Sequence, residues 1–517
     1  MKTVWRFLTK FASLIGSVLH SFDRVIFKGR LSIQWAEELE RFVDFDLKVR
    51  RDYFMNTIAP AWSEELVEHA KRLAKKLGRT YLYRTGGFRK EEWARQLLRE
   101  QRITEGLIGI LCTQETCPSF RLVPGDKRPR FKADRRQQRV LYYYFLDAQM
   151  GFMHVRLETW FPFTIQVYVN GHDWLAQQMA AKGMGFSQRE NAFVQLDDVA
   201  GTQKLADRFA HLKWPKILDR FARLVNPHWR QRLKRYSYYW VTDQAEFATD
   251  LLFTSPSALS GLYRKLLEYA VMTFSAKDVL KFLGRKPDGR LQGEVQTDYK
   301  TDRWPGARIK HRLGRNWLKM YDKFGVILRV ETVINDPGAF KVYRVCHHRD
   351  GTSSTGYYPM PKGVGFLPHY QEQALACHRR YLEALAVVDD PAPAYRELEE
   401  LTESKRVAGR SSAGFNPACR EHVQLFAAVL DGDGVSQGFA NKTIRVRLFG
   451  LTKDAKQAVR QGAAVNRLLK RLHARGLVAK IPRRRRWRVT AKGRNLLSKA
   501  LALYRTTWPQ LFAGQAA

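Results

Sequence analysis

Acidic residues and cysteines are scarce in this chain. Of 517 residues, 50 are Asp or Glu and 89 are Lys or Arg, so the formal net charge is +39. A charge of this size repels itself in a folded protein, and a polyanionic partner relieves that repulsion. Five cysteines cannot build a disulfide framework and suit a reducing compartment. We therefore expect a nucleic-acid partner and a cytoplasmic location, in a bacterial cytosol or nucleoid.

Several sequence motifs are also missing. No apolar run is long enough to span a bilayer, so no membrane partner is expected. The start of the chain, Met1 to Phe22, has Lys10 inside its apolar run and no clear small-residue cleavage site, which predicts an amphipathic helix. No Gly-x-x-x-x-Gly-Lys loop occurs, so no nucleotide cofactor is predicted. No internal repeat and no dimerisation heptad is visible.

The last hundred residues carry the clearest pattern. Asn466 to Arg475 is amphipathic, with its leucines on one side, and Gly476 ends the predicted helix. Leu477 to Ile481 and Trp487 to Thr490 predict two short strands around a basic tip, and Gly493 to Tyr504 predicts another helix. From residue 419 to 517 there are 21 Lys and Arg against 4 Asp and Glu. The candidate nucleic-acid contacts here are Arg467, Lys470, Arg471, Arg475, Arg483, Arg484, Arg485, Arg486 and Arg488.

This order of helix, strand, basic tip, strand and helix is a winged-helix arrangement. Over this stretch it resembles the winged helix of the MarR-type transcription regulators. The resemblance implies a recognition helix in the DNA major groove, with the arginine tip on phosphates or in a minor groove. A winged helix often binds a palindrome as a homodimer, so a homodimer is compatible with this reading. The alternative is a basic, solvated terminal bundle.

The chain as a whole is expected to be α+β. We predict a mixed α/β body that contains an antiparallel β-meander, followed by a C-terminal winged helix-turn-helix domain. Within the body, a short aromatic strand is expected around Tyr238 to Val241, and Asp243 and Glu246 predict a capping box for a following helix. A segment rich in Gly, Ser and Arg, Val407 to Pro417, predicts a linker. The predicted regions are an N-terminal α+β region (1–170), a mainly helical region (171–290), the meander with a following helix (291–388), a linker region (389–418) and the winged helix (419–517).

The meander can be read almost residue by residue. Arg308 to Leu313 and Asn316 to Lys323 flank Gly314-Arg315, and Val326 to Ile334 follows a two-residue turn at Phe324-Gly325. In that register one face carries His311, Leu318, Met320, Asp322, Arg329 and Glu331. The other face carries Arg308, Lys310, Arg312, Trp317, Lys319, Tyr321 and Lys323. The first face offers oxygen and nitrogen ligands for a divalent metal, and the second interleaves cations with aromatics, as a surface for nucleic acid does. A bulge would exchange the faces.

The triplet Tyr321-Asp322-Lys323, followed by Arg329-Val330-Glu331, resembles the Tyr-Asp-Lys … Arg-x-Glu pattern of rolling-circle replication initiators of the plasmid and filamentous-phage types. In that family an antiparallel sheet holds a metal that polarises the scissile phosphate, and a tyrosine attacks to form a 5′-phosphotyrosine. The resemblance implies that Asp322 and Glu331 hold Mg²⁺ or Mn²⁺. Together with Tyr321 of the same triplet and His311 of the predicted metal-ligand face, they are the catalytic candidates. Nothing in the sequence singles out one of the later tyrosines, Tyr343, Tyr357 and Tyr358, as the nucleophile. The His-hydrophobic-His motif of the wider relaxase class is absent; the nearest approach is His154-Val155-Arg156. The alternative is an ordinary sheet with cross-strand ion pairs such as Asp322 with Arg329.

Three functions fit these observations. The first is a DNA-processing protein of a mobile element, an initiator or transposase with metal-dependent strand cleavage, whose meander cations Lys310, Arg312 and Lys319 contact the strand. The second is a non-enzymatic winged-helix DNA-binding regulator. The third is an RNA-binding protein of a ribonucleoprotein. DNA is favoured over RNA as the partner.

Overall fold

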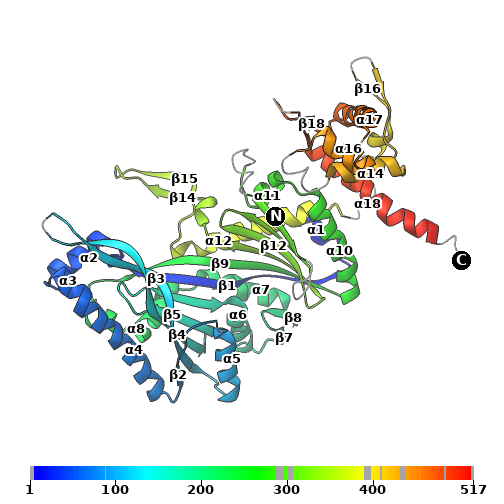
Figure 1. The fold of residues 1–517 in the computed structure, drawn as a ribbon. Helices are drawn as coiled ribbons and strands as arrows, with labels where there is room; N and C mark the ends of the chain where they lie inside the picture. The colour runs from blue at the N-terminus through cyan, green and yellow to red at the C-terminus, as the bar shows by residue number, and fades with distance from the viewer. Residues whose placement is uncertain are drawn as a thin grey trace. The chain divides into compact units, whose positions relative to one another are not determined.

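The computed structural model describes residues 5–87, 89–126, 128–286, 295–300, 307–388, 398–407, 410–430, 438–452, 454–482 and 485–513 (Figure 1). Only the backbone is described for residues 407, 410 and 505–513. The chain divides into two compact units. One, the sheet unit, comprises Phe11–Ser260 and Leu280–Tyr381; the other, the C-terminal unit, comprises Met1–Lys10, Gly261–Val279 and Leu382–Ala517.

The sheet unit is organised around one sheet of eleven strands, in the order β10-β11-β12-β13-β9-β1-β6-β5-β4-β3-β2. Neighbouring strands run antiparallel except β2 and β3, which are parallel. The strands are β1 (Ile15–Leu31), β2 (Thr80–Tyr83), β3 (Gly106–Val123), β4 (Arg130–Asp147), β5 (Gly151–Glu158), β6 (Ile165–Asn170), β9 (Tyr238–Phe253), β10 (Val295–Lys300), β11 (Arg308–Leu313), β12 (Asn316–Lys323) and β13 (Ile327–Ile334). The mixed α and β body and its antiparallel meander are as the sequence predicts.

Helices cover both faces of this sheet at its centre. Helix α6 places His172 near Asp250 of β9, whereas helix α12 places His378 against Thr249, the preceding residue of β9. Successive residues of a strand point to opposite faces, so α6 and α12 lie on opposite faces. The helices are α2 (Ala36–Arg41), α3 (Arg51–Tyr53), α4 (Ala59–Lys76), α5 (Lys90–Glu100), α6 (Gly171–Ala180), α7 (Val199–Arg208), α8 (Trp214–Val225) and α9 (Pro227–Gln231), with the last turn of α11 (Ala276–Phe282) and most of α12 (Leu367–Leu385).

Short elements complete the sheet unit. Among the described strands, two hairpins pair only within themselves: β7 (Phe186–Arg189) with β8 (Ala192–Leu196), and β14 (Lys341–His347) with β15 (Ser353–Pro359). The short helices are η1 (Ser32–Gln34), η4 (Phe209–His211), η6 (Pro337–Ala339) and η7 (Val364–Phe366), with π-helical turns at η2 (Phe42–Asp46) and η3 (Phe54–Ile58).

Strand β9 is the largest departure from the expected secondary structure. The sequence predicts a mainly helical region from 171 to 290, with a short strand around Tyr238 to Val241 and a helix after a capping box at Asp243 and Glu246. Helices α6 to α9 occupy much of that region, but Tyr238–Phe253 is one strand of 16 residues, and the capping-box prediction is wrong. Residues 245–251 are all buried because the strand is covered on both faces, which removes the apolar and polar alternation that marks a strand.

The predicted region boundaries at 170 and 290 also fall inside the sheet unit. Strand β1 pairs with β6 on one side and with β9 on the other, and β9 pairs in turn with β13 of the meander. The N-terminal region, the middle region and the meander therefore build one sheet.

In the part of the C-terminal unit that the structure describes, helices α14, α16 and α17 are followed by a small hairpin and a last helix. These are α14 (Arg420–Leu430), α16 (Asn441–Phe449), α17 (Ala455–Ala474), β18 (Val478–Lys480), β19 (Trp487–Val489) and α18 (Ala491–Ala513). The backbone of Phe439 exchanges two hydrogen bonds of 2.8 Å with Trp487, which adds a third strand position beside β19. A common core of Phe426, Val465, Leu469, Leu472 and Leu497 joins these elements. The unit also contains α1 (Arg6–Lys10), part of α10 (Pro256–Thr273), and the hairpin of β16 (Lys405–Val407) and β17 (Arg410–Ser412).

Helix α17 is longer than predicted and ends where predicted. It begins at Ala455, where the Asp454 side chain accepts a 2.8 Å hydrogen bond from the Lys456 amide, and not near Asn466. Gly476 follows its end with a φ of 70°, the left-handed conformation expected there. The predicted linker at 407–417 differs more: it contains β17, and Phe415 is fully buried in the core. Ser411 and Ser412 lie in β17, and one buried aromatic fixes the segment.

Candidate functional site

In the meander, the predicted site residues do not share the faces that the sequence predicts for them. Strands β11 and β12 pair as expected, with Lys310 opposite Lys319. Between β12 and β13 the register begins with Lys323 opposite Ile327, so the turn has three residues, Phe324 to Val326, and not two. A shift of one residue moves every side chain of a strand to the other face. Arg329 and Glu331 therefore share a face with Lys319, Tyr321 and Lys323, and the predicted faces are wrong for β13.

Asp322 and Glu331 consequently lie on opposite faces of the sheet, so they do not meet as a metal-binding pair. The Asp322 carboxylate accepts a 2.9 Å hydrogen bond from the Gly325 amide and holds the turn. His311, on the same face as Asp322, is fully buried between Thr297 and Tyr381. Burial lowers the pKa of His311 to about 3, which leaves the imidazole neutral.

Glu331 instead joins two carboxylates that the sequence did not single out. One carboxylate oxygen each from Asp23 on β1, Glu246 on β9 and Glu331 on β13 lie within 4.8 Å of one another, and all three residues are buried. These strands are adjacent in the sheet, and the pairing of β1 with β9 shifts between Phe22 and Arg24. Such a bulge re-aims the inserted side chain, here Asp23. We call these three residues the carboxylate cluster.

Cations surround the carboxylate cluster. Arg24 Nε lies 2.9 Å from Glu246 Oε2, and Lys319 Nζ lies 2.5 Å from Glu331 Oε1. Tyr321 donates a 2.7 Å hydrogen bond to the other Glu331 oxygen. Burial would raise the pKa of Glu331, but the charge of Lys319 and the hydrogen bonds from Lys319 and Tyr321 together hold that pKa below its ordinary value. Burial and the neighbouring charge of Glu331 raise the pKa of Glu246 to about 8.

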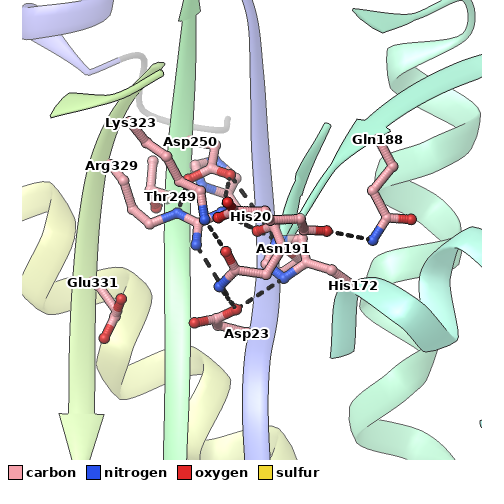
Figure 2. A network of polar contacts seen from close by, with 12 residues as sticks. His20, Asp23, His172, Gln188, Asn191, Thr249, Asp250, Lys323, Arg329 and Glu331 are labelled. Atoms are coloured by element: carbon pink, nitrogen blue, oxygen red, sulfur yellow. Dashed lines mark hydrogen bonds and ion pairs between the residues drawn. The ribbon is translucent and has the colours of Figure 1, made fainter. Parts of the chain in front are cut away.

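A second set of polar contacts continues from Asp23 to Arg329 (Figure 2). The fully buried Arg329 guanidinium binds Asp250 through two hydrogen bonds of 2.6 Å and donates a 2.7 Å bond to the Asn191 carbonyl. Asp23 accepts a 2.7 Å hydrogen bond from the Asn191 side chain, and His172 Nδ1 lies 3.2 Å away from it. Burial opposes ionisation of Asp23, yet contact with His172 and the charge of Arg329 hold its pKa well below the ordinary range.

Two residues of this network, His172 and Asn191, come from outside the eleven-stranded sheet, and local features of the chain position them. The Asn170 side chain caps α6 by accepting hydrogen bonds from the amides of His172 and Asp173, at 2.9 and 3.1 Å. The cap fixes the first turn of α6, and with it the His172 ring. Asn191 lies between β7 and β8, where it also contacts the Lys323 ammonium. Burial and the charge of Arg329 lower the pKa of Lys323 to about 8.

Four of the six residues in the Tyr-Asp-Lys … Arg-x-Glu pattern thus face one site: Tyr321, Lys323, Arg329 and Glu331. Their partners Asp23, Glu246, Asp250, His172 and Asn191 come from distant parts of the chain, and sequence reasoning missed them. The sequence signal for Asp23 is a single acid inside an otherwise apolar and basic strand; nothing similar marks Asn191.

The donor set of the carboxylate cluster suits a hard divalent cation. Two oxygen ligands on opposite sides of such an ion lie about 4 to 5 Å apart, from ligand distances of about 2.1 Å for Mg²⁺ and 2.4 Å for Ca²⁺. The separation within 4.8 Å agrees with this. The three carboxylates are also balanced by Arg24, Lys319 and Arg329, so the cluster is compatible with burial without an ion. An ion would therefore compete with these cations and with the proton on Glu246.

The basic meander residues lie on the face of the carboxylate cluster. Lys310 Nζ sits 3.9 Å from the centre of the Trp317 ring, a cation–π contact. Lys319 is drawn to Glu331, as described above. Arg312 is exposed, and its Nε donates a 2.8 Å hydrogen bond to the Gly314 carbonyl. Lys310 and Arg312 remain close enough to solvent for a contact with phosphate, whereas Lys319 is committed to the cluster.

Helix α17 carries a row of exposed cations. Lys456, Arg460, Arg467 and Lys470 are all exposed, and they recur at i, i+4, i+11 and i+14. At about 100° per residue these positions fall within an arc of roughly 80°, opposite the buried Val465, Leu469 and Leu472. We call these four residues the basic face of α17. Lys456 and Arg460 were missed because the helix was predicted to start later.

The other basic residues predicted to contact nucleic acid near α17 differ in their contacts and exposure. Arg471 donates to the Gly414 carbonyl and stacks 4.3 Å from the Phe415 ring, and Arg475 donates to the carbonyls of Glu403 and Ser412. These two side chains hold β16, β17 and Phe415 to the helix. Arg485 and Arg488 are exposed and Arg486 is half-buried. Arg483 and Arg484 lie outside the described residues.

Comparison with known proteins gives no relative to guide the assignment. No family model, curated protein or solved structure matches the chain. Within the part of the chain that the structure describes, no helix has both the length and the apolar character needed to cross a membrane. The chemistry must therefore be argued from the two surfaces themselves.

Proposed function

We propose that this protein binds nucleic acid, with DNA favoured, through a winged helix in its C-terminal unit. The observation that carries the proposal is the order α14, Phe439, α16, α17, β18, β19, in which α16 and α17 form a helix pair and Phe439 adds a strand position to the β18–β19 hairpin. In helix-turn-helix proteins the second helix of the pair enters the major groove. Here that helix is α17, and its basic face points away from the core.

The charges support duplex DNA as the ligand. The basic face of α17 spans 14 residues, or about 21 Å of helix at 1.5 Å per residue, and it carries four cations without an acidic neighbour among the described ion pairs. Exposed Arg485 and Arg488 extend the charge to the hairpin. Cations in such a row release condensed counterions when they meet phosphates, which makes binding strongly salt-dependent.

The test is a binding titration of the full-length protein with labelled duplex DNA, single-stranded DNA and duplex RNA at several salt concentrations. We expect tight duplex DNA binding that weakens steeply as salt rises. A protein that binds none of these ligands at low salt would overturn the proposal. Preference for duplex RNA over DNA at every salt concentration would replace it with the ribonucleoprotein function.

A second candidate function is metal-dependent strand cleavage in the sheet unit. The specific observation is that Tyr321, Lys323, Arg329 and Glu331 gather with Asp23 and Glu246 on one face, beside exposed Arg312. A divalent ion held by Asp23, Glu246 and Glu331 would supply Lewis-acid polarisation of a phosphate ester. The chain's own part would be to orient the carboxylates through Lys319, Tyr321 and Arg329 and to release the proton from Glu246.

This second function is tested by incubating the protein with single-stranded and duplex DNA, with Mg²⁺, Mn²⁺ or EDTA, on denaturing gels. We expect metal-dependent cleavage that D23N and E331Q abolish while DNA binding is retained. The matched control is D322N, on the same meander but on the other face, which should keep activity. No cleavage by the wild-type protein with either metal would leave a DNA-binding regulator as the function. Cleavage lost equally in D322N would place the chemistry elsewhere.

A further inference from the structure

The hairpin of β14 and β15 exposes an aromatic pair. Its two strands pair only with each other among the described strands, with Tyr343 directly opposite Tyr357. The two ring centroids are 5.4 Å apart and the ring planes meet at 66°. Tyr343 is 62 % exposed and Tyr357 is 70 % exposed, so each ring keeps most of its surface in water.

The two faces of the hairpin differ in chemistry. On the face with the tyrosines lie Lys341, Val345 and His347, which are exposed too. On the other face Val342 is buried, and Arg344 donates hydrogen bonds to the carbonyls of Val345 and Pro359. The hairpin is therefore anchored through one face, and the aromatic face is open to a ligand.

A role in stabilising the hairpin does not explain why the two tyrosine rings are so exposed. A cross-strand aromatic pair stabilises an antiparallel hairpin when the rings cover each other or the strand. Rings in an edge contact at 66° that remain about two-thirds exposed cover little of either. Exposed apolar surface gathered at one place is typical of a binding site.

The charge around the rings identifies the ligand class. From residue 341 to 359 the chain has three Lys and Arg residues and one acid, Asp350, with His347 and His348 in addition. Aromatic rings among cations are the arrangement by which proteins bind single-stranded nucleic acid, because bases stack on the rings and phosphates meet the cations. In a duplex the base faces are already stacked and out of reach.

We propose that the β14–β15 hairpin binds single-stranded nucleic acid, with one unpaired base stacked on Tyr343 and another on Tyr357. The two rings are not parallel, so each takes its own base, and Lys341 and Arg349 meet the flanking phosphates. The inference rests on the proposed nucleic-acid function and adds a single-strand site to it. A protein with both surfaces would hold a duplex at α17 and a melted or displaced strand on the sheet unit.

The test is the affinity of the full-length double variant Y343A/Y357A for a labelled oligothymidine of about 20 nucleotides and for a duplex of the same length. A stacked base contributes about 1 to 3 kcal/mol, so loss of both rings should weaken single-strand binding at least about 30-fold. Duplex binding should change little. Y343F/Y357F should bind like the wild type, because phenylalanine keeps the stacking ring.

The control is Y53A/Y83A, which removes two tyrosines that are 52 % and 50 % exposed on other elements. Single-strand affinity equal in Y343A/Y357A and this control would overturn the single-strand site while leaving the duplex function intact. A wild-type protein that binds neither oligonucleotide would overturn the proposed function and this inference together. A urea-unfolding curve of the alanine variant that matches the wild type shows that its sheet unit is folded, because duplex binding reports on the C-terminal unit alone.

Discussion

Neutralising the basic face of α17 should reduce DNA affinity by an amount that follows from the number of charges. The variant K456Q/R460Q/R467Q/K470Q removes four exposed cations and leaves the buried side of the helix unchanged. Each phosphate contact contributes about 0.9 to the slope of log K against log salt for B-DNA. If all four cations meet phosphates, the slope falls by about 3.6. At 0.15 M salt this corresponds to an affinity loss of about 1,000-fold, the upper limit for this change.

The assay is fluorescence anisotropy with a labelled duplex at salt concentrations from low to physiological. The matched control removes four cations from another exposed helix end, Lys71, Arg72, Lys75 and Lys76 of α4, and lowers the net charge equally. The control should keep most of the wild-type slope. Equal slopes in the α17 variant and the wild type, or equal losses in both variants, would refute the assignment of α17 as the DNA-contacting helix.

Two further predictions concern the buried network. R329M should destabilise the fold by about 3 to 5 kcal/mol in urea unfolding, because it leaves Asp250 and Asp23 buried without their cation. The double variant R329M/D250L should be more stable than R329M. The reverse order of stability would contradict the ion-pair account. E246Q should gain stability relative to the wild type as pH rises from about 5 to 8.5, by no more than about 1.4 kcal/mol per pH unit. The raised pKa means that native Glu246 keeps a proton that the unfolded chain has released, so the wild type loses stability as pH rises through this window. A pH-independent difference between the two proteins would show that Glu246 is ionised throughout.

The sequence predicted local features of the fold better than long-range ones. Gly314-Arg315 fixes a two-residue turn, and the register of β11 with β12 follows from it. At the next turn Val326 was assigned to the strand, although it belongs to the loop, and this one residue separated Asp322 from Glu331. At β9 the sequence predicts only the first residues of the strand, Tyr238 to Val241, because burial on both faces hides the alternation by which the rest would be recognised.

The carboxylate cluster could not be predicted from spacing. Asp23, Glu246 and Glu331 are neighbours only because β1 lies beside β9 and β9 beside β13. No short motif records that order of strands. The pattern on β12 and β13 lies next to the carboxylate cluster because Tyr321, Lys323, Arg329 and Glu331 are close in sequence as well as in space. The duplex function, the metal and the winged helix stay predictions that the experiments above address.

Strand β1 has a consequence for how the protein is made. It lies at the middle of the sheet, and its residue Ile15 pairs with Phe253, a separation of 238 residues (253 − 15). At synthesis rates of about 5 to 20 residues per second, β9 follows β1 from the ribosome after about 12 to 48 s. Until then one edge of a 17-residue strand has no partner on the β9 side. Nascent chains with such an edge aggregate readily, so the yield of folded protein should depend on chaperones that shield this first strand.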